Sequence, residues 1–387
     1  DAAGSRMMAT MAASAPIMTA PRATSATVVV DERDKFRQGT ELALMMKAGL
    51  PGGERNEFSG LHLAELARES ISMSGEKPRS TDRRSIVGQA FQMSGGAHHT
   101  SDFGNILANV MGKAAMVGWE EAPETFPMFT RTGTLTDFKP SSRVATGVFA
   151  TLPKVEEGAD YTYGTVGDRG EPITLATYGK LLRITRQAII NDDLDLLGRI
   201  PRRMGRAARR TIGDLVFAIL TSNPNMSDGV ALFHSDHKNL AAAGSAPSVT
   251  SLSAARAAMR TQKDGDATLN VAPKYLLVPA ALEASANQLI NSTVDPTASK
   301  GHATNPVAGM AEVIADGRLD AASATAWYLA ADPNGYDTIE VAYLDGMESP
   351  YLEEQNVWTS DGVEMKVRVD AGVAPLASQT LYKNAGA

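Results

Sequence analysis

The sequence predicts a mixed α+β fold with mostly antiparallel strands, and three of its features support this fold class. Residues 130–190 are rich in Thr, Val and aromatic residues, contain several Gly and Pro, and show no helical stripe, a pattern typical of strands. An arginine-rich segment then carries a helical pattern to about Ser222, where Asn223-Pro224 ends it. The last third alternates helical and strand patterns. Because 387 residues exceed the usual size of a single hydrophobic core, we expect at least two lobes.

The N-terminal quarter predicts an arm followed by helices. Residues 1–30 are rich in Ala, Ser, Thr and Met without a clear period, which indicates a mobile or extended arm. Helical spacing appears over residues 32–48 and again over 60–73. Residues 76–84 are strongly polar and predict a solvated connector. Ser101 is a suitable N-cap for a further helix, whose apolar residues fall on one face.

Within the strand region, residues 141–180 predict a long two-stranded arm. The segment has few large apolar side chains, and its glycines make the middle prone to turns. An isolated hairpin is only marginally stable in water, so we expect this arm to lie on a neighbouring subunit. Mixed charge near its tip would set register and partner choice. The charged residues are Lys154, Glu156, Glu157, Asp160, Asp168, Arg169 and Glu171.

The long helix is predicted to begin near three aspartates, Asp192, Asp193 and Asp195. Carboxylates at a helix start satisfy free amide groups and face the positive end of the helix dipole. Pro201 and two glycines would weaken an isolated helix, so we expect tertiary contacts to hold it. Five arginines are spaced so that they share one helical face: Arg199, Arg202, Arg203, Arg206 and Arg210.

The last third predicts a second set of elements. These are a capped helix over 251–263, a buried strand over 275–278, a helix over 280–291 with Pro279 in its first turn, and a polar loop over 292–309. Strands are predicted at 310–315, 326–330 and 339–344, near Tyr351, and at 363–369.

The composition excludes several kinds of chemistry. There is no cysteine, which excludes disulfides, thiol catalysis and cysteine-based zinc sites. No apolar run approaches the ~20 residues of a membrane span. The sequence has no P-loop, no dinucleotide-binding glycine motif and no Gly-x-Ser-x-Gly elbow, so nothing calls for a cofactor. The net charge of -7 suits a container better than a protein that grips duplex DNA, because DNA binding usually relies on positive charge.

His234-Ser235-Asp236-His237 is the stretch that could suggest a metal-assisted hydrolase. Two histidines three residues apart can bind zinc on a helix, and the aspartate could orient a water. The segment has a loop-like sequence, however, and no third ligand stands at a recognisable spacing. We therefore favour polar loop residues that hydrogen-bond a turn, and predict no catalytic and no metal residues.

Three blocks of sequence together point to a family. The first joins TSDFGNILANV at 100–110 to EAPETF at 121–126, the second is the whole stretch 171–240, and the third is LNVAPKYLLVP at 269–279. In this order they resemble the Mu-like branch of tailed-phage major capsid proteins, over roughly residues 98–370. The resemblance implies the tailed-phage major capsid fold, with an N-terminal arm, an extended β-hairpin loop, a peripheral domain with a long spine helix, and an axial domain.

The resemblance also implies a division of the chain. The expected parts are an N-terminal arm with helices (1–97), the start of the peripheral domain (98–140), the extended hairpin loop (141–180), the peripheral domain with the spine helix (181–250), the axial domain (251–345), and a return to the peripheral domain (346–387).

The implied function is mechanical rather than enzymatic. Pentamers and hexamers of the chain would tile an icosahedral virion shell around double-stranded DNA, without sequence-specific binding and without a membrane. Assembly in the host bacterial cytoplasm would involve a portal and a scaffold or maturation protease, with a cement protein as a possible addition. We interpret the small-residue start at Asp1 as a mature end made by such a protease.

Other classes of protein fit the sequence less well. The metal-assisted hydrolase is the enzyme alternative. Another phage structural component is a further alternative, but a scaffold would be helical and highly charged throughout, whereas residues 130–190 and 310–370 are rich in strand patterns. Tail-tube proteins are usually shorter.

The arginine face has three interpretations within a shell. The favoured one is pairing with acidic groups of the same or a neighbouring subunit, because guanidinium forks suit carboxylates and interfaces. The arginines could instead line the interior and contact packaged DNA, or form a solvated surface, where charge pairs contribute little. The expected contacts of the hairpin arm with a neighbour are Lys154, Glu156, Glu157, Arg169 and Glu171. No pattern establishes a covalent Lys–Asn cross-link.

Overall fold

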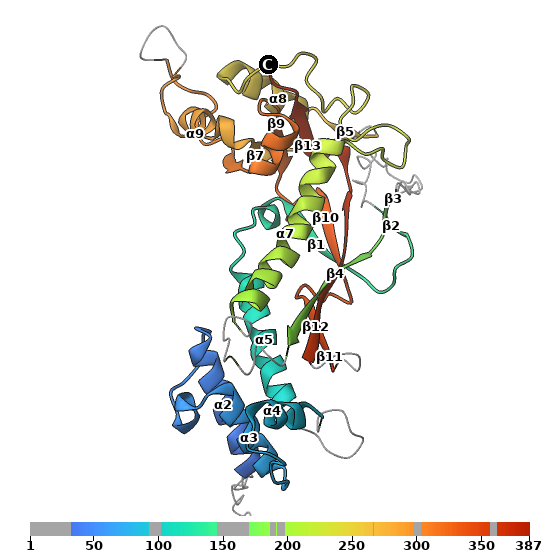
Figure 1. Cartoon of the computed structure of the whole chain (residues 1–387). Helices are drawn as coiled ribbons and strands as arrows, with labels where there is room; N and C mark the ends of the chain where they lie inside the picture. Colours follow the sequence, from blue (N-terminus) through green and yellow to red (C-terminus); the bar gives the residue numbers. More distant parts are fainter. Residues whose placement is uncertain are drawn as a thin grey trace, which may run out of the picture.

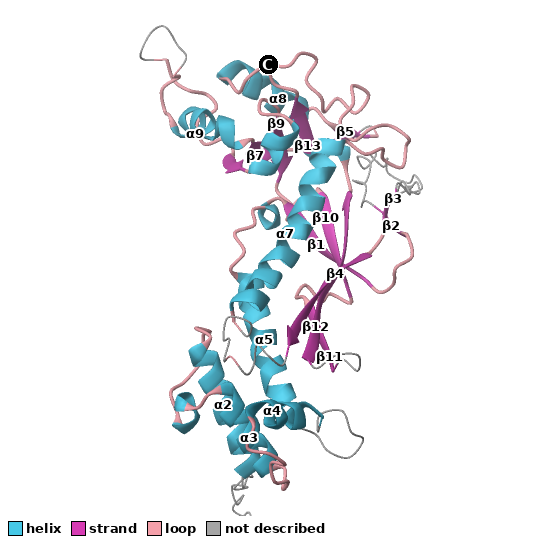
Figure 2. Cartoon of the chain, in the orientation of Figure 1, coloured by secondary structure: helices cyan, strands magenta, loops and turns pink. Residues whose placement is uncertain are grey.

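The computed structural model describes most of the chain and shows an elongated molecule (Figure 1). The described residues are 32–92, 102–144, 170–185, 191, 198–265, 267–296, 303–356 and 362–387. Helices gather at one end, a sheet flanks the middle, and a second sheet with helices forms the end that carries the C-terminus (Figure 2). The predicted N-terminal arm, residues 1–30, lies outside the described residues. None of the described helices combines the length and hydropathy needed to cross a lipid bilayer.

The N-terminal end is a cluster of helices around one apolar core. Its helices are α2 (Glu32–Lys47), the 3-10 turn η1 (Glu57–Gly60), α3 (Leu63–Met73), α4 (Arg83–Gln92) and α5 (Asp102–Glu120). Phe36, Leu66, Val87 and Ile106 come from different helices and are fully buried in this core. The helices predicted over 32–48 and 60–73 are therefore present, with α3 beginning at Leu63 because the backbone N–H of His62 donates to the Glu65 carboxylate (2.8 Å).

The sequence analysis missed α4. It expected a solvated connector over residues 76–84, but the helix begins inside that stretch at Arg83. Ile86, Val87 and Ala90 are buried on its inner side. The polar segment before the helix is tied down as well, because the Gln89 side chain accepts a hydrogen bond from the backbone of Arg79 (3.0 Å).

A five-stranded sheet flanks the middle of the molecule. Its strands are β1 (Thr130–Leu135), β4 (Ala176–Thr185), β10 (Ile339–Leu344), β11 (Tyr351–Asn356) and β12 (Gly362–Pro375). The order is β1-β10-β12-β11, and β4 pairs along the other side of β12. Only β1 and β10 run parallel within this sheet, so the predicted antiparallel character is confirmed. β12 is longer than the predicted 363–369 because it bridges β11 at one end and β10 at the other.

A four-stranded sheet forms the core of the other end. Its order is β13-β9-β7-β8, with strands β7 (Pro273–Val278), β8 (Glu312–Ala315), β9 (Trp327–Ala331) and β13 (Leu381–Asn384). Helices α8 (Val249–Arg260) and α9 (Glu283–Asn291) pack into its core, where Leu252, Leu289 and Trp327 are buried. Smaller elements complete the described chain: η3 (Phe126–Met128), β2 (Ser141–Val144), β3 (Gly170–Ile173), β5 (Lys263–Asp264), β6 (Ala267–Thr268), η5 (Ala280–Leu282), α10 (Gly317–Ala322) and η6 (Ser378–Thr380).

Sheet membership departs from the predicted boundary at residue 345. β10, placed in the 251–345 part, pairs with β1 and β12 of the five-stranded sheet. β13, placed in the 346–387 part, pairs with β9 of the four-stranded sheet. The chain therefore crosses between the sheets earlier than predicted and crosses back once more at its end. Pairing between strands far apart in the sequence decides this, and a local pattern carries no signal for it.

Helix starts in the last third also shift slightly. α8 begins at Val249 because Ser248, rather than Ser251, is the N-cap: its side chain accepts from the backbone of Ser251 (3.1 Å). Pro279 precedes the short turn η5 instead of lying in the first turn of α9.

Helix α7 (Arg199–Ser222) runs through the middle of the molecule and ends at Ser222, as predicted. Its N-cap is Gly198, so the helix begins later in the sequence than the predicted start near Asp192, Asp193 and Asp195. Those aspartates lie outside the described residues, and their role at the helix start stays a prediction. A Cβ on Gly198 would stand 3.0 Å from the Cβ and the carbonyl oxygen of Ala48, which follows α2, so a larger residue there would press on Ala48.

Two glycines let α5 and α7 approach each other closely. A Cβ on Gly205 of α7 would lie 1.9 Å from the carbonyl oxygen of Ala115, and a Cβ on Gly118 of α5 would lie 1.9 Å from the carbonyl oxygen of Arg202. The missing side chain of each glycine thus leaves room for the backbone of the facing helix. Gly205, which weakens the isolated helix, is what permits the tertiary contact that holds it.

Replacing Gly205 with alanine should destabilise the protein even though alanine favours helix formation. The added methyl group would overlap backbone that cannot move away, so we expect a loss of about 1–3 kcal/mol in the free energy of unfolding. Gly112→Ala in α5 is the matched control, since its Cβ would meet only Leu352 Cδ1 at 3.5 Å. The control should gain about 0.5–1 kcal/mol. Denaturant unfolding of both variants tests this, and equal effects would contradict the close crossing.

Candidate functional site

The base of the predicted hairpin arm is present as a short antiparallel pair. β2 (Ser141–Val144) pairs with β3 (Gly170–Ile173), and Arg143 stands opposite Glu171. The segment between these strands, 145–169, lies outside the described residues. Four of the predicted contact residues, Lys154, Glu156, Glu157 and Arg169, fall in that segment, so their contacts remain predictions.

One strand of this base is held to the body by a buried ion pair. Arg143 donates from Nε to Glu340 Oε1 on β10 (2.9 Å) and from Nη2 to the carbonyl of Thr134 on β1 (2.6 Å). The Glu340 side chain is only 7 % exposed. A Cβ on Gly133 would lie 1.8 Å from Glu340 Oε1, so that glycine makes room for the carboxylate. The sequence analysis missed this pair, although a lone glutamate within the apolar strand Ile339–Leu344 was a usable signal, since buried charges are paired.

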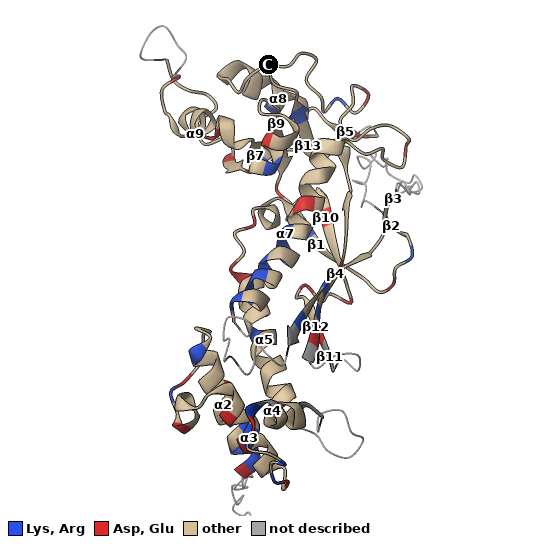
Figure 3. Ribbon diagram, in the orientation of Figure 1, with Lys and Arg blue, Asp and Glu red and all other residues tan. Residues whose placement is uncertain are grey.

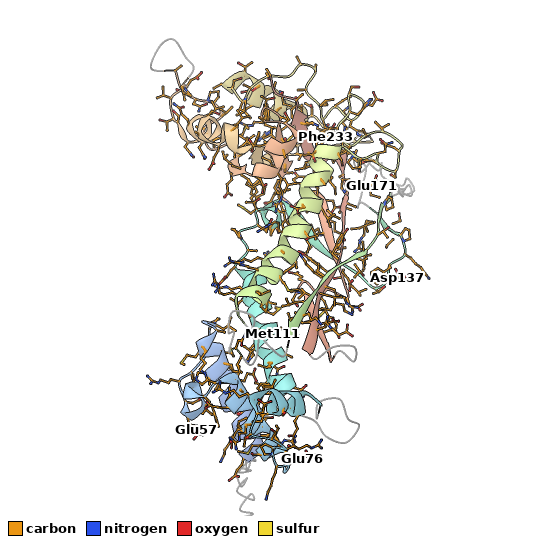
Figure 4. All side chains as sticks on the ribbon, viewed as in Figure 1. Glu57, Glu76, Met111, Asp137, Glu171 and Phe233 are labelled. Carbon is orange, nitrogen blue, oxygen red and sulfur yellow. The ribbon has the colours of Figure 1, made fainter. Side chains whose placement is uncertain are left out.

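The other strand is held through Glu171 (labelled in Figure 4). Its carboxylate is buried and accepts hydrogen bonds from the backbone N–H of Ser227 (2.9 Å to Oε2) and from the Ser227 hydroxyl (2.6 Å to Oε1). Ser227 belongs to the turn that follows α7. This contact corrects the expectation that Glu171 reaches a neighbouring subunit, because its carboxylate is already used within its own chain.

The arginine face of α7 is only partly paired within the described part of the chain. Glu121, which directly follows α5, accepts hydrogen bonds from Nε (2.8 Å) and Nη2 of Arg202 and from Nη2 of Arg206 (2.8 Å). These bonds hold the pKa of the Glu121 carboxyl below its usual value, and the bond to Glu121 raises the pKa of Arg202. Arg203 and Arg210 are exposed and make no ion pair or hydrogen bond with the described part of the chain. Arg199 is exposed at the first position of α7.

Arg209 is a sixth arginine of this helix that the predicted face did not include. Its Nη1 lies 3.4 Å from the carbonyl oxygen of Trp119, and its guanidinium carbon lies 5.5 Å from the Trp119 ring centroid. The side chain therefore packs against α5.

An ion-pair cluster joins α7 to the four-stranded end and was also missed. Arg318 contacts Glu124 (2.8 Å), Asp214 (2.6 Å) and Asp316 (3.1 Å). Burial alone would lower the pKa of Arg318, but the bond to Asp214 and the charges of Glu124 and Asp316 raise it overall. A Cβ on Gly213 would lie 2.3 Å from Glu124 Oε2, so this glycine, like Gly205, admits a neighbour. Three sequence-distant carboxylates meet here, and no local motif marks them.

The histidines of the 234–237 stretch have separate structural partners. His237 Nε2 contacts Asp228 Oδ2 (2.8 Å) and its Nδ1 faces the carbonyl of Leu232 (3.1 Å). His234 Nδ1 accepts from the backbone of Asp236 (3.2 Å). Among the described residues, no three His, Cys, Asp or Glu side chains form a group that could hold a metal ion. The geometry is that of a hydrogen-bonded turn.

Comparison with known proteins identifies the family. The family described as phage capsid protein matches residues 170–384, more than half of the chain. The chain therefore belongs to the phage capsid protein family, and its function is that of a major capsid protein. The match is to the family as a whole, whereas the Mu-like resemblance concerns a narrower branch. No curated protein matches the sequence.

Solved capsid structures resemble this chain at low sequence identity. The capsid of Ralstonia phage GP4 has a TM-score of 0.50 at 12 % identity, covering 69 % of this chain and 92 % of that chain. The capsid of cyanophage P-SCSP1u has a TM-score of 0.46 at 12 % identity, covering 69 % and 89 %. The procapsid of bacteriophage JBD30 has a TM-score of 0.42 at 15 % identity, covering 73 % and 75 %. The family match and the likeness to the GP4 capsid confirm the predicted tailed-phage capsid fold.

Breaking the buried pair at the hairpin base should cost more than breaking an exposed pair. Arg143→Met leaves the Glu340 carboxylate buried without its partner, so we expect a loss of about 2–4 kcal/mol in the free energy of unfolding. Arg131→Met, which removes an exposed partner of Asp337 (2.7 Å) on the same sheet, should cost less than about 1 kcal/mol.

The double variant Arg143→Met with Glu340→Met distinguishes two causes of destabilisation: lost packing of the arginine, and the carboxylate left buried without its partner. It should recover a large part of the loss, because removing both charges removes the desolvation penalty. Thermal and urea unfolding measure all variants. Equal destabilisation by Arg143→Met and Arg131→Met would contradict the anchoring role of Arg143.

Proposed function

We propose that copies of this chain form pentamers and hexamers that close into an icosahedral shell around phage double-stranded DNA. The observation that carries this proposal is the capsid family match over residues 170–384, together with the shared fold. A shell subunit must present the same contacts repeatedly around a ring, which head-to-tail interfaces achieve. We further propose that the chain belongs to the Mu-like branch.

The hairpin arm is the proposed contact between subunits. Its base is fixed to the five-stranded sheet through Arg143–Glu340 and to the turn after α7 through Glu171–Ser227. A fixed base lets the segment 145–169 act from a defined position on a neighbouring copy. Within that segment, Lys154, Glu156, Glu157 and Arg169 are the proposed contact residues, and their mixed charge would set the register between neighbours.

The two sheets suggest how the parts divide. We assign α5, α7 and the five-stranded sheet to the peripheral domain, and the four-stranded sheet with α8 and α9 to the axial domain. The boundaries follow sheet membership, so β10 is peripheral and β13 is axial. Residues 1–97 would supply the N-terminal arm and its helical cluster.

The role of the protein is structural, with no reaction of its own. A portal and a scaffold or maturation protease are proposed partners during assembly in the host cytoplasm, and a cement protein is a possible partner of the finished virion. The alternative metal-assisted hydrolase has no support in the described geometry, because His234 and His237 have separate partners.

Deleting residues 154–169, with a short Gly-Ser closure, should leave the subunit folded but unable to build stable shells. The buried clusters of the described chain are built from residues outside this segment. We therefore expect the melting temperature to change by less than about 3 °C, the shift expected for under 1 kcal/mol in a chain of this size. Shell yield, measured by light scattering and sedimentation, should fall at least tenfold. Normal shells from the deletion would show that the arm is dispensable, and an unfolded subunit would show that the segment belongs to the core.

A variant of unchanged length tests whether the arm acts through its charges or only through its length. Glu156→Gln, Glu157→Gln, Asp160→Asn and Asp168→Asn together keep the arm but remove its acidic groups. If the charges set the register, this variant should form shells of reduced yield or altered regularity in negative-stain images. Shells identical to those of the parent would assign the arm's role to its backbone and apolar contacts alone.

A further inference from the structure

Three exposed arginines form a line along α7. Arg203, Arg206 and Arg210 follow one another at spacings of three and four residues, so they project from one side of the helix over roughly 10 Å. Figure 3 shows the basic residues gathered on the half of α7 nearest the N-terminal helices. We call these three residues the arginine ridge.

The described chain supplies fewer acidic partners than the ridge has arginines. Residues 199–213 contain six arginines and no Asp or Glu. Glu121 is shared between Arg202 and Arg206, and no described residue forms an ion pair or hydrogen bond with Arg203 or Arg210. The ridge begins at Arg203, in the second turn of α7.

A further cation stands beside the ridge. A hollow of about 730 Å³ lies between α7 and the β4–β12 part of the five-stranded sheet, and both Arg203 and Lys180 line it. The other lining residues are uncharged at neutral pH. The positive surface therefore extends from the helix onto β4 without an acidic group between them.

A uniform polyanion suits this surface better than the acidic groups of a neighbouring hairpin. The segment 154–169 carries two basic and four acidic residues, so its charge is mixed, and Glu171 is already bound to Ser227. Duplex DNA instead presents one phosphate charge about every 1.7 Å of its axis, so a 10 Å ridge spans several phosphates. Guanidinium groups match phosphate oxygens bidentately.

We propose that the arginine ridge, assisted by Lys180, is a contact surface for the phosphate backbone of the DNA that the shell encloses. The proposal rests on the proposed shell function and adds a ligand class to a defined face of the subunit. The contact carries no base specificity, because every group involved reads phosphate. With three or four cations on each subunit of an otherwise acidic chain, each contact is weak and salt-sensitive, which allows the DNA to leave.

The test measures binding of a fluorescent 20-base-pair duplex to full-length subunits kept unassembled at low concentration. Binding anisotropy is followed from 50 to 200 mM salt for the parent, for Arg203→Gln/Arg206→Gln/Arg210→Gln, and for a control. The control, Arg256→Gln/Arg260→Gln/Lys263→Gln, removes the same charge from α8 and β5, at the end of the molecule that carries the C-terminus. Three phosphate contacts correspond to a slope of about -2.7 in log affinity against log salt, so the parent should lose about 40-fold affinity over this range.

The ridge variant should lose most of that slope and bind at least tenfold more weakly at 50 mM salt, while the control keeps the parental slope. Equal binding by the ridge variant and the parent, or no salt-dependent binding by the parent, overturns the proposal. Shell yield is measured separately, on concentrated samples of the same proteins. If the ridge variant alone fails to assemble while its DNA binding is unchanged, the ridge is a contact between subunits and the proposal is wrong. A parent that binds DNA through the ridge but never forms shells would instead contradict the proposed shell function.

Discussion

The structure depends on the close crossing of α5 and α7, which Gly118 and Gly205 permit. Each glycine admits a backbone carbonyl of the other helix, so the two helices pack at a distance that no residue with a side chain allows there. The crossing fixes α7 against the N-terminal helical cluster. It also brings Trp119 of α5, and Glu121 directly after it, to Arg202, Arg206 and Arg209 of α7. These contacts hold α7 in place although its proline and glycines would weaken it as an isolated helix.

Several buried or partly buried charges of the described chain lie where separate elements are joined. Arg318 gathers Glu124, Asp214 and Asp316, and so ties α7 to the four-stranded end. Arg143 with Glu340, and Glu171 with Ser227, tie the hairpin base to the five-stranded sheet and to the turn after α7. Removing one partner of such a partly buried pair lowers the free energy of unfolding strongly, because the other charge stays buried without a partner. They therefore define the relative positions of the parts that a shell subunit must keep fixed.

The sequence predicted the elements whose signals are local. The end of α7 at Ser222 and the bounds of β10 agree with the structure because a helix stop and an apolar strand run are visible in a few residues. The tertiary arrangement could not be predicted in the same way. Arg143 and Glu340 are 197 residues apart, and the assignment of β10 and β13 to their sheets depends on distant partners. For the same reason Glu171 was expected to face a neighbour and instead binds its own chain.

The central claim is that this chain builds a closed shell. Negative-stain microscopy of the expressed full-length protein, combined with light scattering at rising concentration, tests it most directly. The account predicts closed particles or capsomer rings, with or without an added scaffold. A species that stays strictly monomeric at high concentration under both conditions would contradict it.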